Sequence, residues 1–161
     1  MKTLDNALKS YFNTSDSKRL NLKHIFYDSE KHNYYLCNGY SIIRLNYNNL
    51  KDKEKIDYII SAYGLSDNKE RTIEISNFDK TFGNYNHCNY IDIDTLEVKK
   101  DMFNHKIITI NGRGFDLKEI NRIKRVLGGN KFGIFYSTEN DNSISITSKN
   151  GYAFLLGCIK Y

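Results

Sequence analysis

Residues 107–129, IITINGRGFDLKEINRIKRVLGG, hold the clearest folding pattern in the chain. They predict a short strand, a glycine turn and then a helix over 117–127 that Asp116 caps. Leucine and isoleucine recur through this helix at the spacing of one buried face. Gly128 and Gly129 predict its end, because glycine readily takes the backbone conformation that terminates a helix.

The same order of elements is expected at both ends of the chain. A helix over 3–12 comes before three strands near the N-terminus, and the helix over 117–127 comes before three strands near the C-terminus. The strands are expected at 20–27, 34–37, 41–47, 131–136, 143–148 and 152–161. A run of this kind at each end predicts two α-β-β-β units, the second of which begins with a strand of its own.

Two tripeptides support an internal repeat. The sequence IFY stands at 25–27 and again at 134–136, and NGY stands at 38–40 and again at 150–152. Both matches occur in the same order and in the same kind of expected element. The Asn-Gly step at 38–40 also predicts a tight hairpin turn of type I′, in which both central residues need positive φ.

This pattern resembles one domain of the bacterial sliding clamp and of clamp-like phage proteins. The segments CNGYSIIRL (37–45) and SKNGYAFLL (148–156) are similar to the strand, turn and aliphatic strand of that family. The resemblance implies an α+β fold in which two α-β-β-β pseudo-repeats pack as one sliding-clamp-like domain with a central insertion. A complete clamp ring has six such domains, whereas this chain supplies one, and the pocket that binds partner peptides in full clamps has no counterpart here.

The expected organisation is a single domain over 1–161. Pseudo-repeat one covers about 1–48, the insertion about 49–105, and pseudo-repeat two about 106–161. Within the insertion, a charged helix and two strands are expected, at 50–63, 71–76 and 90–98.

Basic residues gather around the helix over 117–127. Residues 113–131 contain six basic residues and two acidic residues, Asp116 and Glu119, so this stretch has a local charge of +4. The six candidate binding residues are Arg113, Lys118, Arg122, Lys124, Arg125 and Lys131. Three of them recur at i, i+4 and i+7 and are expected to share one helix face. Such a stripe is suited to phosphate groups, although an amphipathic helix also needs a polar face of some kind.

Other motifs give weaker indications of chemistry. Asp92 and Asp94 alternate along an expected strand, where they could hold a divalent cation or simply form a solvated face. The glycine pair Gly112 and Gly114 is half of a dinucleotide fingerprint, and Leu117 replaces its third glycine, so a tight turn explains it better. The three cysteines and four histidines are scattered. We therefore expect no catalytic residues, no metal site and no cofactor.

Composition and profile lead to the functional prediction. The chain has a formal charge of +5, a pI near 9.0, no proline and 13 tyrosines. Asparagine, lysine, isoleucine and tyrosine are all abundant, which is typical of an AT-rich bacterial or phage genome. Without a signal peptide or a run of ~18 apolar residues, it is expected in the cytoplasm of the host cell, away from membranes. Its profile resembles that of phage proteins that inhibit host enzymes by protein contact, first among them the anti-CRISPR inhibitors of Cas9.

Two alternatives remain at this point. One is a clamp-like replication accessory that binds duplex DNA through the basic helix. The other is a metal-dependent nuclease that uses Asp92 and Asp94. The sequence leaves direct contact with nucleic acid, the partner and the oligomeric state open.

Overall fold

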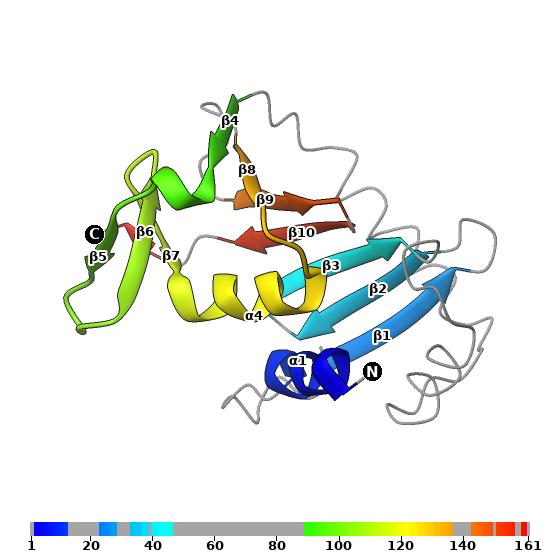
Figure 1. Cartoon of the computed structure of the whole chain (residues 1–161). Coiled ribbons are helices and arrows are strands. Elements are labelled where there is room, and N and C mark those ends of the chain that lie inside the picture. Colours follow the sequence, from blue (N-terminus) through cyan, green and yellow to red (C-terminus); the bar gives the residue numbers. More distant parts are fainter. Residues whose placement is uncertain are drawn as a thin grey trace.

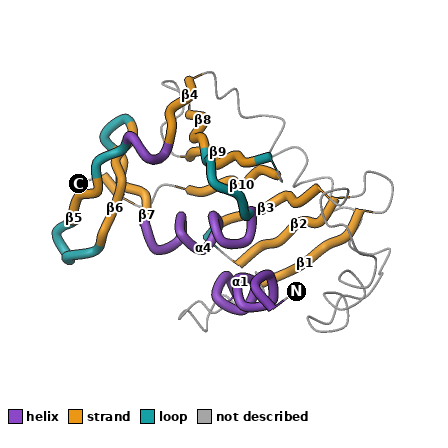
Figure 2. The backbone as a smooth tube through the Cα atoms, in the orientation of Figure 1, coloured by secondary structure: helices purple, strands orange, loops and turns teal. Residues whose placement is uncertain are grey.

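The computed structural model describes residues 2–12, 23–28, 33–38, 40–46, 89–136, 143–149, 151–156 and 159–160. The expected helix over 50–63 and the expected strand over 71–76 lie outside these residues. Within them the fold is α+β, with two α-helices and two antiparallel sheets (Figures 1 and 2).

The larger sheet has seven strands and combines both ends of the chain. In spatial order its strands are β1 (Lys23–Asp28), β2 (Asn33–Asn38), β3 (Ser41–Asn46), β10 (Gly151–Leu156), β9 (Ser143–Ser148), β8 (Gly133–Tyr136) and β4 (Asn89–Asp92). The two halves meet where β3 pairs with β10, with Gly151 opposite Leu45 and Leu155 opposite Ser41. Consequently, the first and last thirds of the chain share one hydrogen-bonded sheet.

The smaller sheet has four strands. Their spatial order is β11 (Ile159–Lys160), β7 (Arg113–Asp116), β6 (Lys106–Ile110) and β5 (Val98–Lys100). A short 3-10 helix, η4 (Ile93–Thr95), links β4 of the larger sheet to β5 of the smaller one. The segment expected as an insertion over 49–105 thus supplies a strand to each sheet.

Helix α4 (Leu117–Leu127) begins and ends where the sequence predicts. The Asp116 side chain accepts a hydrogen bond from the Lys118 backbone N–H at 2.8 Å, and the Gly128 N–H donates to the Lys124 carbonyl at 2.9 Å. Gly128 has φ +66°, so it occupies the left-handed region that favours glycine. Both predicted caps are confirmed.

The core lies under α4 and between the sheets. Helix α1 (Lys2–Phe12) lies beside α4, and α4 packs on β3 and β10 of the larger sheet and on β6 and β7 of the smaller one (Figure 1). Apolar residues of both helices and both sheets form one buried cluster. Its fully buried members include Leu8, Tyr11, Ile43, Phe115, Ile120, Ile123, Ile134, Ile144, Ile146 and Ala153. Helix α4 therefore joins the two sheets through its apolar face.

Two predictions about the chain before α4 are wrong. The residues expected as a turn into the helix form a hairpin, in which β6 and β7 are joined by Asn111 (φ +52°) and Gly112 (φ +73°). This two-residue loop with positive φ at both positions has the geometry of a type I′ turn. Strand β7 gives little signal in the sequence, because it has only four residues and contains a glycine. The strand expected at 90–98 is interrupted by η4, since the Asp92 side chain accepts a hydrogen bond from the Asp94 N–H and caps a helical turn.

The two NGY tripeptides occupy different positions in their hairpins. Asn38 is the last residue of β2, and the register that places Cys37 opposite Ile42 puts Asn38 opposite Ser41. In the other hairpin Gly151 already belongs to β10 and lies opposite Ser148. The predicted type I′ turn with Asn38 as a central residue is therefore wrong, because Asn38 has no positive φ and lies within a strand.

Candidate functional site

The six predicted binding residues divide into two groups by exposure. Lys118 and Arg125 lie on the exposed face of α4, and Lys131 is exposed shortly after the helix. The other three, Arg113, Arg122 and Lys124, are half-buried. Only half of the predicted set therefore presents its charge fully to solvent.

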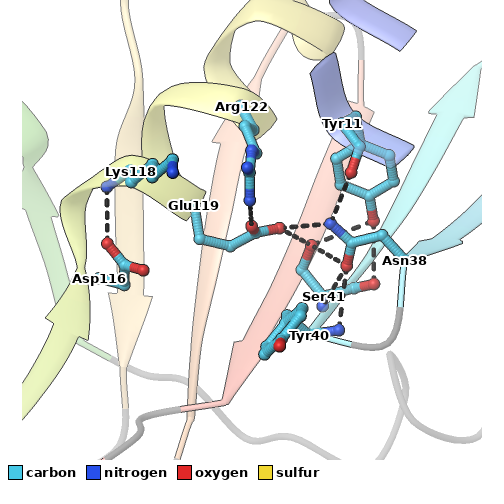
Figure 3. Close-up of polar contacts among 8 residues, drawn as sticks. All are labelled: Tyr11, Asn38, Tyr40, Ser41, Asp116, Lys118, Glu119 and Arg122. Atoms are coloured by element: carbon cyan, nitrogen blue, oxygen red, sulfur yellow. Dashed lines mark hydrogen bonds and ion pairs between the residues drawn. The ribbon is translucent and has the colours of Figure 1, made fainter. Parts of the chain in front are cut away.

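Arg122 is committed to an internal ion pair. Its Nη1 donates to Glu119 Oε2 at 3.2 Å, and the two side chains are 16% and 5% exposed. Glu119 lies on the buried side of α4, one turn before Arg122, so this pair stabilises the protein's interior (Figure 3). The predicted stripe of three basic residues on one face is accordingly reduced to Lys118 and Arg125.

Lys124 and Arg113 have other surroundings than the exposed pair Lys118 and Arg125: one lies beside an aromatic ring and the other in the smaller sheet. Lys124 Nζ is 5.0 Å from the centre of the Phe132 ring, the geometry of a cation–π contact. Arg113 begins β7, next to the turn at Gly112 and opposite Lys160 of β11. The structure therefore distributes the six residues over α4, the segment after it and the smaller sheet.

A buried polar cluster lies between α4, α1 and the β2–β3 turn. Its members are Tyr11, Asn38, Ser41 and Glu119, which are 0%, 0%, 3% and 4% exposed, and Arg122 closes its rim (Figure 3). Burying polar groups is costly unless they form hydrogen bonds, so their partners decide whether this cluster stabilises the fold.

Asn38 forms all four hydrogen bonds that its side-chain amide allows. Its Nδ2 donates to Glu119 Oε1 at 2.7 Å and to the Tyr11 carbonyl at 2.9 Å. Its Oδ1 accepts from the backbone N–H groups of Tyr40 and Ser41, each at 3.0 Å. This pattern fixes the orientation of the amide, because the reverse orientation would set donors against donors.

Ser41 and Tyr11 complete the cluster. Ser41 Oγ donates to Glu119 Oε1 at 2.9 Å. The Tyr11 hydroxyl donates to the Ser41 carbonyl at 2.9 Å and lies 3.0 Å from Ser41 Oγ. Burial raises the pKa of Tyr11 well above its ordinary value, and this effect outweighs the hydrogen bond to Ser41, which lowers it. The Tyr11 hydroxyl therefore remains protonated as a donor across the physiological range.

The sequence contains a signal for this cluster. Glu119, Ile123 and Val126 follow at i, i+4 and i+7, so a carboxylate falls among apolar residues on the face of α4 that packs inward. A charged residue on that face requires partners, because an isolated buried charge is strongly unfavourable. The partners themselves lie 81 and 78 residues away in the sequence, at Asn38 and Ser41.

The acidic pair considered for metal binding is not placed on one strand face. Asp92 ends β4 and caps η4, while Asp94 lies within η4. In the described part of the chain, no three His, Cys, Asp or Glu side chains come close enough to hold a metal ion.

Comparison of the chain with protein-family models, with curated proteins and with solved structures returned no match. Among the residues that the structure describes, neither helix is long and apolar enough to cross a membrane.

Proposed function

We propose that this chain is a non-enzymatic binding protein of phage or mobile-element origin that inhibits a host nucleic-acid enzyme by protein contact. The target proposed first is a Cas9-type nuclease. The observation that supports contact through α4 is that buried hydrogen bonds fix this helix to the rest of the fold. Glu119 anchors its inner face to the β2–β3 turn, and Lys118 and Arg125 remain exposed on its outer face.

Burial of the polar cluster favours a binding role over catalysis. Tyr11, Ser41 and Glu119 carry groups that enzymes use as acids, bases and nucleophiles, yet each is less than 5% exposed. The hydroxyl of Ser41 and the carboxylate of Glu119 are occupied by hydrogen bonds to each other. These groups stabilise the fold and do not face a substrate.

Three of the six candidate binding residues, Lys118, Arg125 and Lys131, are exposed, and they determine how many anionic groups this surface can meet. A surface with three cations fits a limited acidic or RNA-facing region of a nuclease complex. For duplex DNA, each neutralised phosphate contributes about −0.9 to the slope of log K against log salt, so three contacts give roughly −2.7. Such a small electrostatic contribution is weak for duplex binding alone, which favours a protein complex as the principal target.

A second candidate, a clamp-like accessory that binds duplex DNA, is favoured by the order of elements. Helix α1 is followed by β1, β2 and β3, and α4 is followed by β8, β9 and β10. The two sets of three strands meet at β3 and β10, and the two helices lie side by side (Figure 1). This order is consistent with two α-β-β-β pseudo-repeats in one sliding-clamp-like domain, which we retain as part of the proposal.

The main proposal is tested by mixing the protein with a purified Cas9–guide complex. We expect co-elution on gel filtration and reduced cleavage of target DNA. The variant Lys118→Ala/Arg125→Ala/Lys131→Ala should lose both effects, whereas Asn121→Ala, an exposed uncharged change on α4, should retain them. If the native protein neither co-elutes nor reduces cleavage, Cas9 inhibition is excluded.

A titration against duplex DNA at two salt concentrations distinguishes the second candidate, the clamp-like accessory, from the inhibitor. Steep weakening with salt, lost in the same triple variant, would support the clamp-like role, and no binding at low salt would remove it. Arg122 is left unchanged in both experiments, because replacing it would disturb its pair with buried Glu119.

A further inference from the structure

The turn that joins β5 to β6 exposes two large apolar side chains. We name residues 101–105 the hairpin tip. Met102 is 81% exposed and Phe103 is 64% exposed, next to each other in the sequence. Figure 1 shows this turn at the lower left edge of the molecule, where the smaller sheet ends. Single exposed apolar residues are common, but two adjacent ones at the end of a hairpin suggest a contact surface.

The hairpin tip is held in one conformation by Asp101. Its Oδ1 accepts from the backbone N–H groups of Phe103 at 2.9 Å and His105 at 2.8 Å, and its Oδ2 lies 3.3 Å from His105 Nδ1. Two backbone bonds close the turn, from Asp101 N–H to the His105 carbonyl and from Asn104 N–H to the Asp101 carbonyl, both at 3.0 Å. Asn104 takes φ +66°. Because the turn is already ordered, little conformational entropy is lost when Met102 and Phe103 meet a partner.

The charge around the hairpin tip favours an anionic partner. Lys99, Lys100 and Lys106 are all exposed on the strands behind the turn, and the last two lie opposite each other. Two exposed carboxylates lie nearby: Glu97, two residues before Lys99, and Asp116, which is opposite Ile107 on β7. The Asp101 carboxylate is engaged within the turn. Desolvation raises the pKa of Asp101, but the N–H groups of His105 and Phe103 and the His105 ring lower it by more. The pKa of Asp101 is therefore below its ordinary value.

We propose that the hairpin tip binds single-stranded nucleic acid, with Phe103 stacked on a base and with Lys100 and Lys106, which share one face of the hairpin, beside the phosphates. An aromatic side chain and a set of cations are the two elements by which proteins bind single strands without sequence preference. Duplex DNA is a poorer fit, because its bases must first be unstacked and two lysines repay little of that cost. A lipid surface is a poorer fit too, since only two apolar side chains would enter it.

This inference does not depend on Cas9 inhibition, and it concerns a different element from α4. It is tested with a fluorescein-labelled 20-nucleotide oligo-dT at about 50 mM salt. We expect measurable binding that weakens by about fivefold or more in Phe103→Ser, the loss typical of one stacked base. For two phosphate contacts on a single strand, the slope of log K against log salt should be roughly −1.4.

Two control variants separate the hairpin tip from the rest of the surface. Tyr152→Ser removes another exposed aromatic side chain, on β10, and Lys9→Ala removes an exposed cation on α1; both should bind oligo-dT as the native protein does. Phe103→Ser changes an exposed position, so its thermal midpoint should stay close to that of the native protein. Equal binding by native protein and Phe103→Ser, or no binding by the native protein, would overturn the proposal.

The chain contains no tryptophan, so Phe103→Trp introduces a single tryptophan at the hairpin tip, whose emission can be excited apart from that of the tyrosines. Stacking on a base should quench its emission when oligo-dT is added. Vesicles of phosphatidylglycerol and phosphatidylcholine provide the comparison. A blue shift with these vesicles, together with no response to oligo-dT, would assign the hairpin tip to a membrane surface and reject the nucleic-acid proposal.

Discussion

Replacing Glu119 by alanine should destabilise the protein more than any surface change on α4. Glu119 accepts hydrogen bonds from Asn38 Nδ2, Ser41 Oγ and Arg122 Nη1. Without it, the first two donors remain buried and lose this acceptor. Each such group costs about 1–3 kcal/mol, and removing one partner of a buried ion pair costs about 3–5 kcal/mol. These penalties describe one network and do not add, so we expect a loss of about 3–5 kcal/mol in the free energy of unfolding.

A loss of this size is large against the total stability of a domain, which is about 5–15 kcal/mol. Urea unfolding, followed by circular dichroism, measures it as a shift of the midpoint. Glu119→Gln keeps an acceptor for Asn38 and Ser41 but places an amide against Arg122, so it should lose about 1–2 kcal/mol. Asn121→Ala, exposed on the same helix, should stay within about 0.5 kcal/mol of the native protein. A loss below about 1 kcal/mol for Glu119→Ala would refute the structural role of the cluster.

Two further predictions concern a pair of glycines and one tyrosine. Gly151→Ala should cost about 3 kcal/mol, because its Cβ would overlap the Arg44 carbonyl oxygen of β3. Gly112→Ala should cost about 1 kcal/mol, because Gly112 has open space around it but a φ of +73°. Urea midpoints that rank the two variants in the reverse order would contradict this prediction. Burial raises the pKa of Tyr11, so the native state keeps a proton that the unfolded chain loses near pH 10. The contribution of Tyr11 to the free energy of unfolding is therefore complete below pH 10. Above pH 10 it falls by about 1.4 kcal/mol per pH unit. The stability difference between the native protein and Tyr11→Phe should therefore shrink from pH 9 to pH 11 in urea titrations, and a difference that stays constant would show that folding does not raise the pKa of Tyr11.

Helix α4 could be predicted to the residue because its signals are local. Asp116, Gly128 and the apolar spacing between them act within a few residues of one another. The β6–β7 hairpin is harder to predict from the sequence, although Asn111 and Gly112 form the type I′ turn that an Asn-Gly step favours. The same step occurs after Cys37, where it takes another place in the hairpin. Local sequence proposes a turn, but the register of the flanking strands decides which residues occupy it.

The polar cluster and the hairpin tip could not be located from sequence for a different reason. Glu119 marks a buried charge, but its partners Asn38 and Ser41 lie at the β2–β3 turn, which only tertiary packing brings to α4. Met102 and Phe103 look like ordinary core residues in the sequence. Their exposure depends on the edge position of β5 and on the Asp101 turn, neither of which a periodic pattern reveals.

The position of Glu119 also determines how binding experiments on α4 must be designed. Its carboxylate links the helix to Asn38 and Ser41, while Lys118 and Arg125 project from the other side. Disrupting the cluster would change the orientation of the helix and its exposed charges together. Loss of binding in a variant of Glu119 or Arg122 would therefore not distinguish a lost contact from a displaced helix. Only the changes at exposed positions, which leave the cluster intact, test whether α4 itself meets the partner.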